Sequence, residues 1–306
     1  MTEQTKANIE RLINSIHSHR TNLDTIAQQL RTPEIIATFN QWSYDSWCIS
    51  VAGDALVRLR LFTEQNFNFI ETMGLISVAR YTFELSVWLH LFKLNARYGL
   101  VYFRRLLDTQ EHYYKTEKAQ LEREVALLNS FARREKESQE AVLKDISTLS
   151  SADEQEKALL SIPTLSKAID AEANKHFSLY IQAAQVNGYE FQAYLVQTKA
   201  IPEVDKALAE VAAEIDRFNA TVPQDIKDLI PRRRQRLHWN WRDMATLVGL
   251  DDEYDYIYSF TSKLLHATPA SITTNQKNLE IAEMQMLLKY IDVKMVILEA
   301  LAQEYC

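Results

Sequence analysis

The sequence predicts an all-α protein, a multi-helix bundle with no significant sheet. Its 306 residues include only 5 glycines and 6 prolines, too few turn formers for the tight loops of a β-sandwich, a barrel or a dinucleotide-binding α/β fold. Hydrophobic residues make up 47% of the chain, enough to bury a large core, which excludes a disordered protein. We expect a single domain over residues 1–306.

The first four expected helices follow from apolar periodicity and from proline and glycine. Apolar residues at helical spacing predict one amphipathic helix over residues 3–30, which the Thr-Pro pair ending at Pro33 stops. Pro33 suits the first turn of a second helix, which runs through Trp47. Two more helices are expected over residues 54–74 and 75–99, each ending in a glycine at the position of a C-cap.

The second half of the chain continues in helices. From residue 102 to about 149, apolar residues recur every three or four positions among charged ones, which indicates long helices with exposed outer faces. Residues Ser151 to Glu154 have the form of a capping box. Further helices are expected over residues 163–187, 188–198, 202–218, 241–248 (stopped by Gly249), 252–266 and 275–303. We interpret residues 108–200 as a projecting helical hairpin, inserted in a core that residues 1–107 and 201–306 form.

Composition also indicates the compartment and the classes of partner. The N-terminal segment lacks the apolar stretch of a secretory signal. The most apolar segment, residues 75–94, carries Arg80, Glu84, His90 and Lys93, so we interpret it as a buried core helix and expect no membrane contact.

Cys48 and Cys306 have no paired spacing and are expected to be reduced and unbridged, as in a cytoplasmic protein. A net charge of −7 argues against a general nucleic-acid coat, although not against a local basic patch. We expect no cofactor and no metal, because neither paired ExxH motifs nor an HExxH motif or a cysteine cluster occurs.

The first candidate site is Arg80 with Glu84. The two charges lie four residues apart in an otherwise apolar helix, where they can pair with each other. Buried charges need partners because their desolvation costs several kcal/mol each. Two interpretations stay open: a structural ion pair that fixes the helix, or the floor of a polar pocket with the guanidinium directed at an anionic ligand.

The second candidate site is a stripe on the helix expected over residues 252–266. Tyr254, Tyr258, Ser262 and His266 follow one another at steps of four, which places them along one helix face. A satisfied structural network is again the alternative. Because buried polar groups nearly always find partners, we predict that this stripe faces Arg80 and Glu84 and that the Arg80 and His266 side chains lie within about 12 Å.

A basic run between residues 231 and 242 is the one concentrated positive patch of the sequence. Its arginines could hold a phosphate backbone while its two tryptophans stack on bases. The alternative is a solvated loop whose arginines pair with acidic helices. The candidate ligand-binding residues of this run are Arg232, Arg233, Arg234, Arg236, His238, Trp239 and Trp241.

These residues resemble the bacterial domain-of-unknown-function family number 5677 over residues 75–270. The shared pattern is an R-x-x-x-E core helix, a tryptophan segment leading to a short helix, and a tyrosine, a serine and a histidine at steps of four. In this chain it falls on Arg80, Glu84, Trp239 or Trp241, Tyr258, Ser262 and His266. The chain departs from the pattern at Thr261, where the family usually has leucine, and at Asn240, where serine or threonine is common. Membership implies no known reaction.

That family in turn resembles, more loosely, the HEPN superfamily. The resemblance implies a helical bundle, frequently a homodimer, and in many members a metal-independent ribonuclease of a defence system with an R-x(4–6)-H motif. Arg80 has no histidine four to six residues after it. A HEPN-like site would therefore have to be assembled from Arg80, Glu84 and His266 on separate helices.

Three functions remain open at this stage. We rank first a helical protein that binds a nucleotide or nucleic acid such as RNA, in a bacterial defence system. The alternative enzyme is a metal-independent ribonuclease, with His266 as general base, Arg80 stabilising the phosphorane and Glu84 orienting one of them. The third function is a scaffold that docks a partner through residues 108–200. A homo-oligomer or a protein partner is expected.

Overall fold

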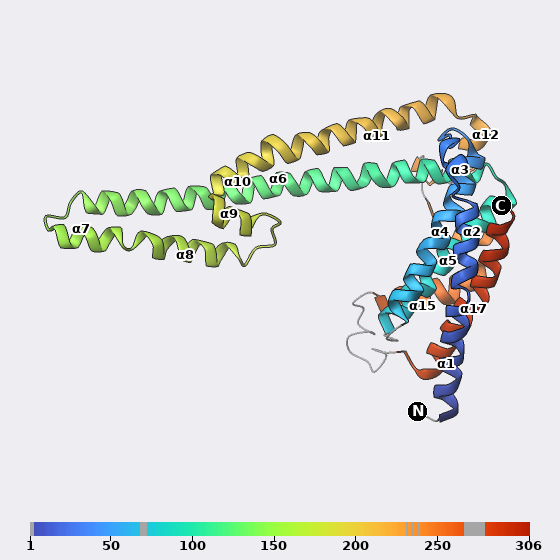
Figure 1. Ribbon diagram of the computed structural model, residues 1–306. Helices are drawn as coiled ribbons and strands as arrows, with labels where there is room; N and C mark the ends of the chain where they lie inside the picture. Colours follow the sequence, from blue (N-terminus) through green and yellow to red (C-terminus); the bar gives the residue numbers. More distant parts are fainter. Residues whose placement is uncertain (1–2, 68–71, 231, 234–235, 238, 266–278) are drawn as a thin grey trace. The chain divides into compact units, whose positions relative to one another are not determined.

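The computed structural model describes residues 3–67, 72–230, 232–233, 236–237, 239–265 and 279–306. Helices make up most of these residues, so the all-α prediction is confirmed (Figure 1). The strands of the described residues are two pairs of residues, β1 (Arg232–Arg233) and β2 (Arg236–Leu237). They form one antiparallel pairing in which Arg232 lies opposite Leu237.

The chain divides into two compact units, residues 1–105 with 221–306 and residues 106–220. The elements of the first unit are α1 (Glu3–Ser18), α2 (Arg20–Gln29), α3 (Pro33–Ala37), α4 (Tyr44–Asn66), α5 (Thr72–Leu94), α12 (Gln224–Lys227), α13 (Trp241–Leu247), α14 (Asp251–Glu253), the π-helical turn η2 (Tyr254–Tyr258), α15 (Ser259–Leu265) and α17 (Ile281–Gln303), with β1 and β2. Those of the second are α7 (Ala152–Leu159), α8 (Ile162–Ala173), α9 (Ile181–Asn187), α10 (Tyr189–Leu195) and the π-helical turn η1 (Val196–Ala200). Two helices belong to both units: α6 (Tyr98–Ile146) and α11 (Ile201–Thr221). The projection of residues 108–200 stays a prediction.

Helix α5 forms the centre of the first unit. It packs against α17 and α4, α2 packs on α4, and α1 packs on α17 (Figure 1). Leu75, Phe83 and Leu89 of α5 are fully buried. The interpretation of residues 75–94 as a core helix is therefore confirmed. None of the helices in the described part of the chain has the length and apolar character that crossing a membrane requires.

The helix expected over residues 3–30 is interrupted, so this prediction is wrong. α1 ends at Ser18 and α2 begins at Arg20. His19 lies at the break, and its ring contacts two carboxylates of α17: Nδ1 lies 2.9 Å from Oε1 of Glu299, and Nε2 lies 3.6 Å from Oδ1 of Asp292. A contact with a distant helix thus accompanies the break, and local periodicity contains no information about it.

Two glycines expected to end helices lie inside them instead. Gly74 belongs to α5 and Gly99 to α6, while α4 runs across both Gly53 and the boundary expected at residue 54. At Gly99 a Cβ atom would stand 2.1 Å from the carbonyl oxygen of Tyr44, so glycine allows α4 and α6 to approach closely. Only the stop at Gly249 is confirmed: its φ of 70° favours glycine, and it follows α13.

The prediction of a capping box at Ser151 is also wrong, because the hydrogen bonds of the box are not formed. Ser151 is the N-cap residue of α7, but its side chain accepts no bond from the helix. The described capping box lies at the start of α17, where Glu280 and Glu283 bond each other's backbone N–H groups.

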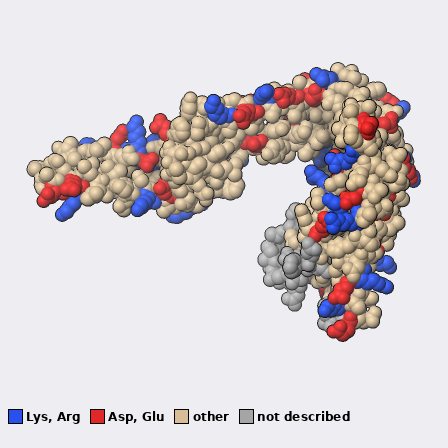
Figure 2. Space-filling model, in the orientation of Figure 1, with Lys and Arg blue, Asp and Glu red and all other residues tan. Residues whose placement is uncertain are grey.

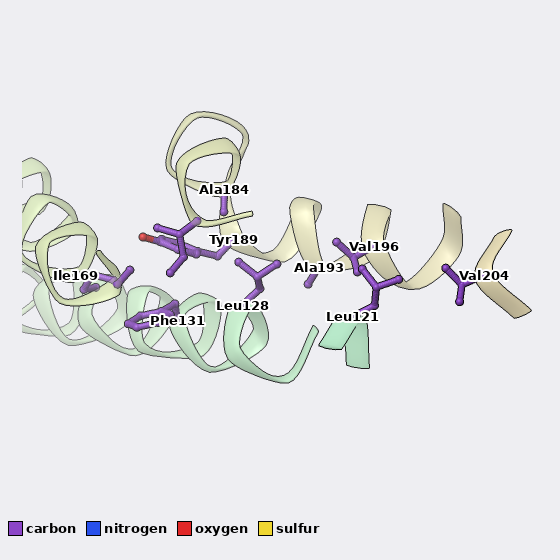
Figure 3. Packing of buried hydrophobic residues seen from close by; sticks show 11 residues of the cluster. Leu121, Leu128, Phe131, Ile169, Ala184, Tyr189, Ala193, Val196 and Val204 are labelled. Atoms are coloured by element: carbon purple, nitrogen blue, oxygen red, sulfur yellow. The ribbon is translucent and has the colours of Figure 1, made fainter. Parts of the chain in front are cut away.

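The second unit has its own hydrophobic core. Leu128 and Phe131 of α6 pack against Tyr189 at the start of α10 and Ala184 of α9, as Figure 3 shows. The helix expected over residues 163–187 is interrupted between α8 and α9. Glu124, which is 1% exposed, accepts hydrogen bonds from Ser178 Oγ and, at 3.0 Å, from the Leu179 N–H within this break.

The net negative charge of the chain lies in the second unit. Residues 106–220 contain 20 Asp and Glu against 13 Lys and Arg, whereas the rest of the chain contains 21 of each. Basic and acidic side chains are interspersed on the face drawn in Figure 2. Cys48 and Cys306 are free, which confirms that they are not bridged.

Candidate functional site

Arg80 and Glu84 form the predicted ion pair on α5. Arg80 Nε lies 3.1 Å from Glu84 Oε1, and the two side chains are 25% and 28% exposed. Because most other residues of α5 are buried, this pair is a polar stripe on a largely apolar helix. The pair is recessed, yet each side chain remains partly exposed to solvent.

Two hydroxyl groups from the other predicted stripe bind the same guanidinium. Arg80 Nη2 donates to Tyr258 Oη at 2.9 Å, and Nη1 donates to Ser262 Oγ at 3.2 Å. The predicted juxtaposition of the two stripes is confirmed for these residues. His266 lies outside the described residues, so its distance from Arg80, like the catalytic roles proposed for the site, stays a prediction.

A π-helical turn positions Tyr258. Residues Tyr254–Tyr258 form η2, and single π-turns within α-helices occur frequently at functional sites. The Tyr254 and Tyr258 rings stack with centroids 4.9 Å apart, and both pack on Phe83 of α5, at 6.2 and 6.0 Å. Arg80 Cζ lies 4.4 Å from the centroid of the Tyr258 ring, a cation–π contact.

Burial controls the protonation of the site. Burial raises the pKa of Glu84, and the hydrogen bond and charge of Arg80 oppose this rise only in part. Burial likewise raises the pKa of Tyr258, and the charge of Arg80 acts against it. Tyr258 is therefore a neutral phenol at physiological pH, and a hydroxyl that accepts from Arg80 keeps its own proton to donate.

The tryptophans of the basic run are packed on α5. The Trp239 ring stacks on Trp88 with centroids 4.2 Å apart and planes 14° apart, and Trp241 meets Trp88 edge-on at 6.4 Å. One face of Trp239 is thus covered by protein. The backbone here forms β1 and β2 rather than an open loop.

Most of the charged side chains in this run lie outside the part of the chain that the structure describes. Arg232, Arg233 and Arg236 lie in the two strands, whereas Arg234 and His238 fall outside the described residues. Their role as ligand-binding residues stays a prediction, as does base stacking by the two tryptophans.

Sequence reasoning missed a buried network on α17. Lys294, 5% exposed, lies 2.7 Å from Glu253 Oε1, and the Tyr290 hydroxyl donates to Glu253 Oε2 at 3.0 Å. The signal was present, because Lys294 lies in a largely apolar helix, as Arg80 does. This network connects α17 to α14, directly before η2.

Comparison with known proteins adds one observation. Residues 165–281 match the model of a family of unknown function, DUF5677. The match supports the resemblance to that family, but over a different range from the expected 75–270: Tyr258, Ser262 and both tryptophans lie within it, whereas Arg80 and Glu84 lie outside. No curated protein and no solved structure matches the chain. Among the described residues, no cluster of His, Cys, Asp or Glu is arranged to hold a metal ion.

Proposed function

We propose that this protein binds a phosphate group of RNA or of a nucleotide at Arg80. One observation carries the proposal: three side chains from two separate segments bind the Arg80 guanidinium, and the Arg80 side chain as a whole is still 25% exposed. A preorganised guanidinium that loses little freedom on binding is well suited to a phosphate.

The neighbouring hydroxyls extend the donor set. Tyr258 Oη and Ser262 Oγ each accept a hydrogen bond from Arg80, so their own protons can point to a phosphate oxygen. Glu84 accepts from Nε, while Ser262 and Tyr258 accept one N–H each from Nη1 and Nη2, so each of these two nitrogens keeps a second N–H for a ligand. The site therefore offers a cation and two neutral hydroxyl donors.

The charge distribution is compatible with an anionic ligand. The unit that contains Arg80 has as many basic as acidic residues, and the excess negative charge belongs to residues 106–220. The unit to which a phosphate binds at Arg80 thus carries no net charge of its own.

Fluorescence anisotropy tests the proposal with a labelled single-stranded RNA and a labelled nucleoside triphosphate. We expect Arg80→Gln to weaken binding of at least one probe about tenfold or more, since charge-assisted hydrogen bonds contribute about 1.5–3 kcal/mol. Ser262→Ala, a milder change, should weaken it less. The control is Arg97→Gln, which removes an exposed arginine paired with Asp225. Equal binding by wild type and Arg80→Gln contradicts the proposal.

A metal-independent ribonuclease is the second candidate. It is favoured by the hydrogen bond from Arg80 to Ser262, which lies four positions before His266 in the sequence. In this reaction His266 takes the proton of a ribose 2′-hydroxyl, whose oxygen attacks the adjacent phosphorus. The bond to the 5′-oxygen breaks, the leaving 5′-oxygen takes a proton from water, and a 2′,3′-cyclic phosphate and a 5′-hydroxyl end result. Labelled RNA incubated in EDTA should yield these ends with wild type but not with His266→Ala. RNA that binds but stays intact rules this candidate out.

A further inference from the structure

Arg242 is a second guanidinium beside the Arg80 site. It lies in α13, its side chain is 61% exposed, and its Cζ stands 6.0 Å from the centroid of the Tyr254 ring. Its charge is paired with Asp255, whose Oδ1 and Oδ2 lie 3.2 and 3.3 Å from Nη2.

The stacked tyrosines connect the two arginines. Arg80 contacts the Tyr258 ring at 4.4 Å, Tyr258 stacks on Tyr254 at 4.9 Å, and Arg242 contacts Tyr254 at 6.0 Å. The two guanidinium groups thus contact different rings of one stacked pair, and both rings pack on Phe83.

The two arginines differ in how readily they accept a new partner. Arg242 and Asp255 are 61% and 58% exposed, and an ion pair of this kind contributes about 0–1 kcal/mol. A phosphate can therefore replace Asp255 at little cost. Arg80, in contrast, is recessed and bound by three side chains. A flexible single strand can bend to contact both a recessed and an exposed cation. The rigid backbone of a duplex is less able to do so.

We propose that Arg242 contacts a second phosphate of the ligand bound at Arg80, so that the ligand is a single strand of RNA rather than a free nucleotide. This inference rests on the proposed phosphate binding at Arg80. Asp255 then acts as a competitor: it occupies Arg242 in the free protein and is displaced by the RNA.

The salt dependence of binding tests this assignment. Each phosphate contact to a single strand contributes about 0.7 to the slope of log K against log salt concentration. Arg242→Gln should lower the slope for a labelled single-stranded RNA by about this amount. Arg97→Gln, which also removes an exposed arginine paired with an aspartate, should leave the slope unchanged.

Asp255→Asn provides a test in the opposite direction, because it removes the competitor and should tighten RNA binding. The variants' urea midpoints are compared with wild type so that a folding defect is recognised. Binding should also strengthen from mononucleotide to short oligonucleotide. A slope unchanged by Arg242→Gln, with Arg80→Gln still defective, overturns the second contact alone. If Arg80→Gln binds RNA as wild type does, the proposed function itself is overturned. If the protein binds an RNA duplex more strongly than a single strand, the single-strand assignment is overturned.

Discussion

The Tyr258 hydroxyl makes the shortest of the three side-chain hydrogen bonds to Arg80, at 2.9 Å. Tyr258→Phe keeps the ring for the cation–π contact and removes only this acceptor. We expect a loss of about 1 kcal/mol in the free energy of unfolding, below the usual 1.5–3 kcal/mol for a charged donor because Arg80 is partly exposed. Urea denaturation measures it. Tyr113→Phe, at a side chain that is 60% exposed, is the control and should change stability by less than about 0.5 kcal/mol.

Glu84 makes stability depend on pH in a defined direction. Burial raises its pKa above the ordinary 4.5, so the protonated carboxyl favours the folded state and this advantage disappears as pH rises through the folded-state pKa. Glu84→Gln imitates the protonated form. Relative to this variant, wild type should be most stable near pH 4 and lose stability toward pH 7, as urea unfolding at several pH values would show. The reverse trend would mean that the attraction of Arg80 outweighs the burial of Glu84.

Sequence reasoning identified Arg80, Glu84, Tyr258 and Ser262 because charged and hydroxyl groups stand out in apolar helices and must find partners. The same reasoning applied to Lys294 would have predicted a buried partner, which the structure shows to be Glu253. It could not have found the Trp88 stack on Trp239, because aromatic residues in a core helix have many apolar partners and none is prescribed by spacing.

At the scale of helices, periodicity located the elements better than it located their ends. The break at His19 accompanies contacts with Glu299 and Asp292 of α17, far away in the sequence. Gly74 and Gly99 lie within helices because tertiary packing outweighs the low helix propensity of glycine. Gly249 follows the end of its helix as predicted, because the helix ends in a local backbone turn with positive φ, a conformation that favours glycine.

The link between α17 and α14 should respond asymmetrically to mutation. Glu253→Gln leaves the Lys294 cation buried without its counter-charge, whereas Lys294→Met leaves a Glu253 carboxylate that is 28% exposed and still bonded to Tyr290. We expect Glu253→Gln to cost about 2–3 kcal/mol and Lys294→Met about 1 kcal/mol or less, measured by urea unfolding. Equal costs would show that the carboxylate needs the lysine as much as the lysine needs it.

At the scale of the whole molecule, each unit has its own core, and composition alone predicted that these cores would be helical. The sequence analysis expected an insert over residues 108–200, and the units divide at residues 106 and 220. Neither division coincides with a proline or a glycine, because α6 runs through residue 106 and α11 ends at Thr221.

Separate cores predict separate responses to a cavity. Phe131→Ala removes a side chain that is 1% exposed in the second unit and should cost about 3–5 kcal/mol there. Hydrogen exchange followed by mass spectrometry should show faster exchange within residues 106–220 and unchanged protection of α5. Faster exchange in α5 as well would mean that the two units unfold together.

The π-helical turn η2 makes the site a matter of chain length as well as of residue identity. A π-turn holds one residue more than a regular helical turn, so loss of one exposed residue, such as Tyr256, allows an unbroken α-helix. Because the wider i→i+5 turn accommodates the extra residue, its loss leaves the later side chains close to their present directions, and Ser262 stays at Arg80. A homologue with a one-residue gap at this turn should therefore retain the site, whereas a gap in α15 before Ser262, where the helix is regular, would rotate Ser262 by about 100° away from Arg80.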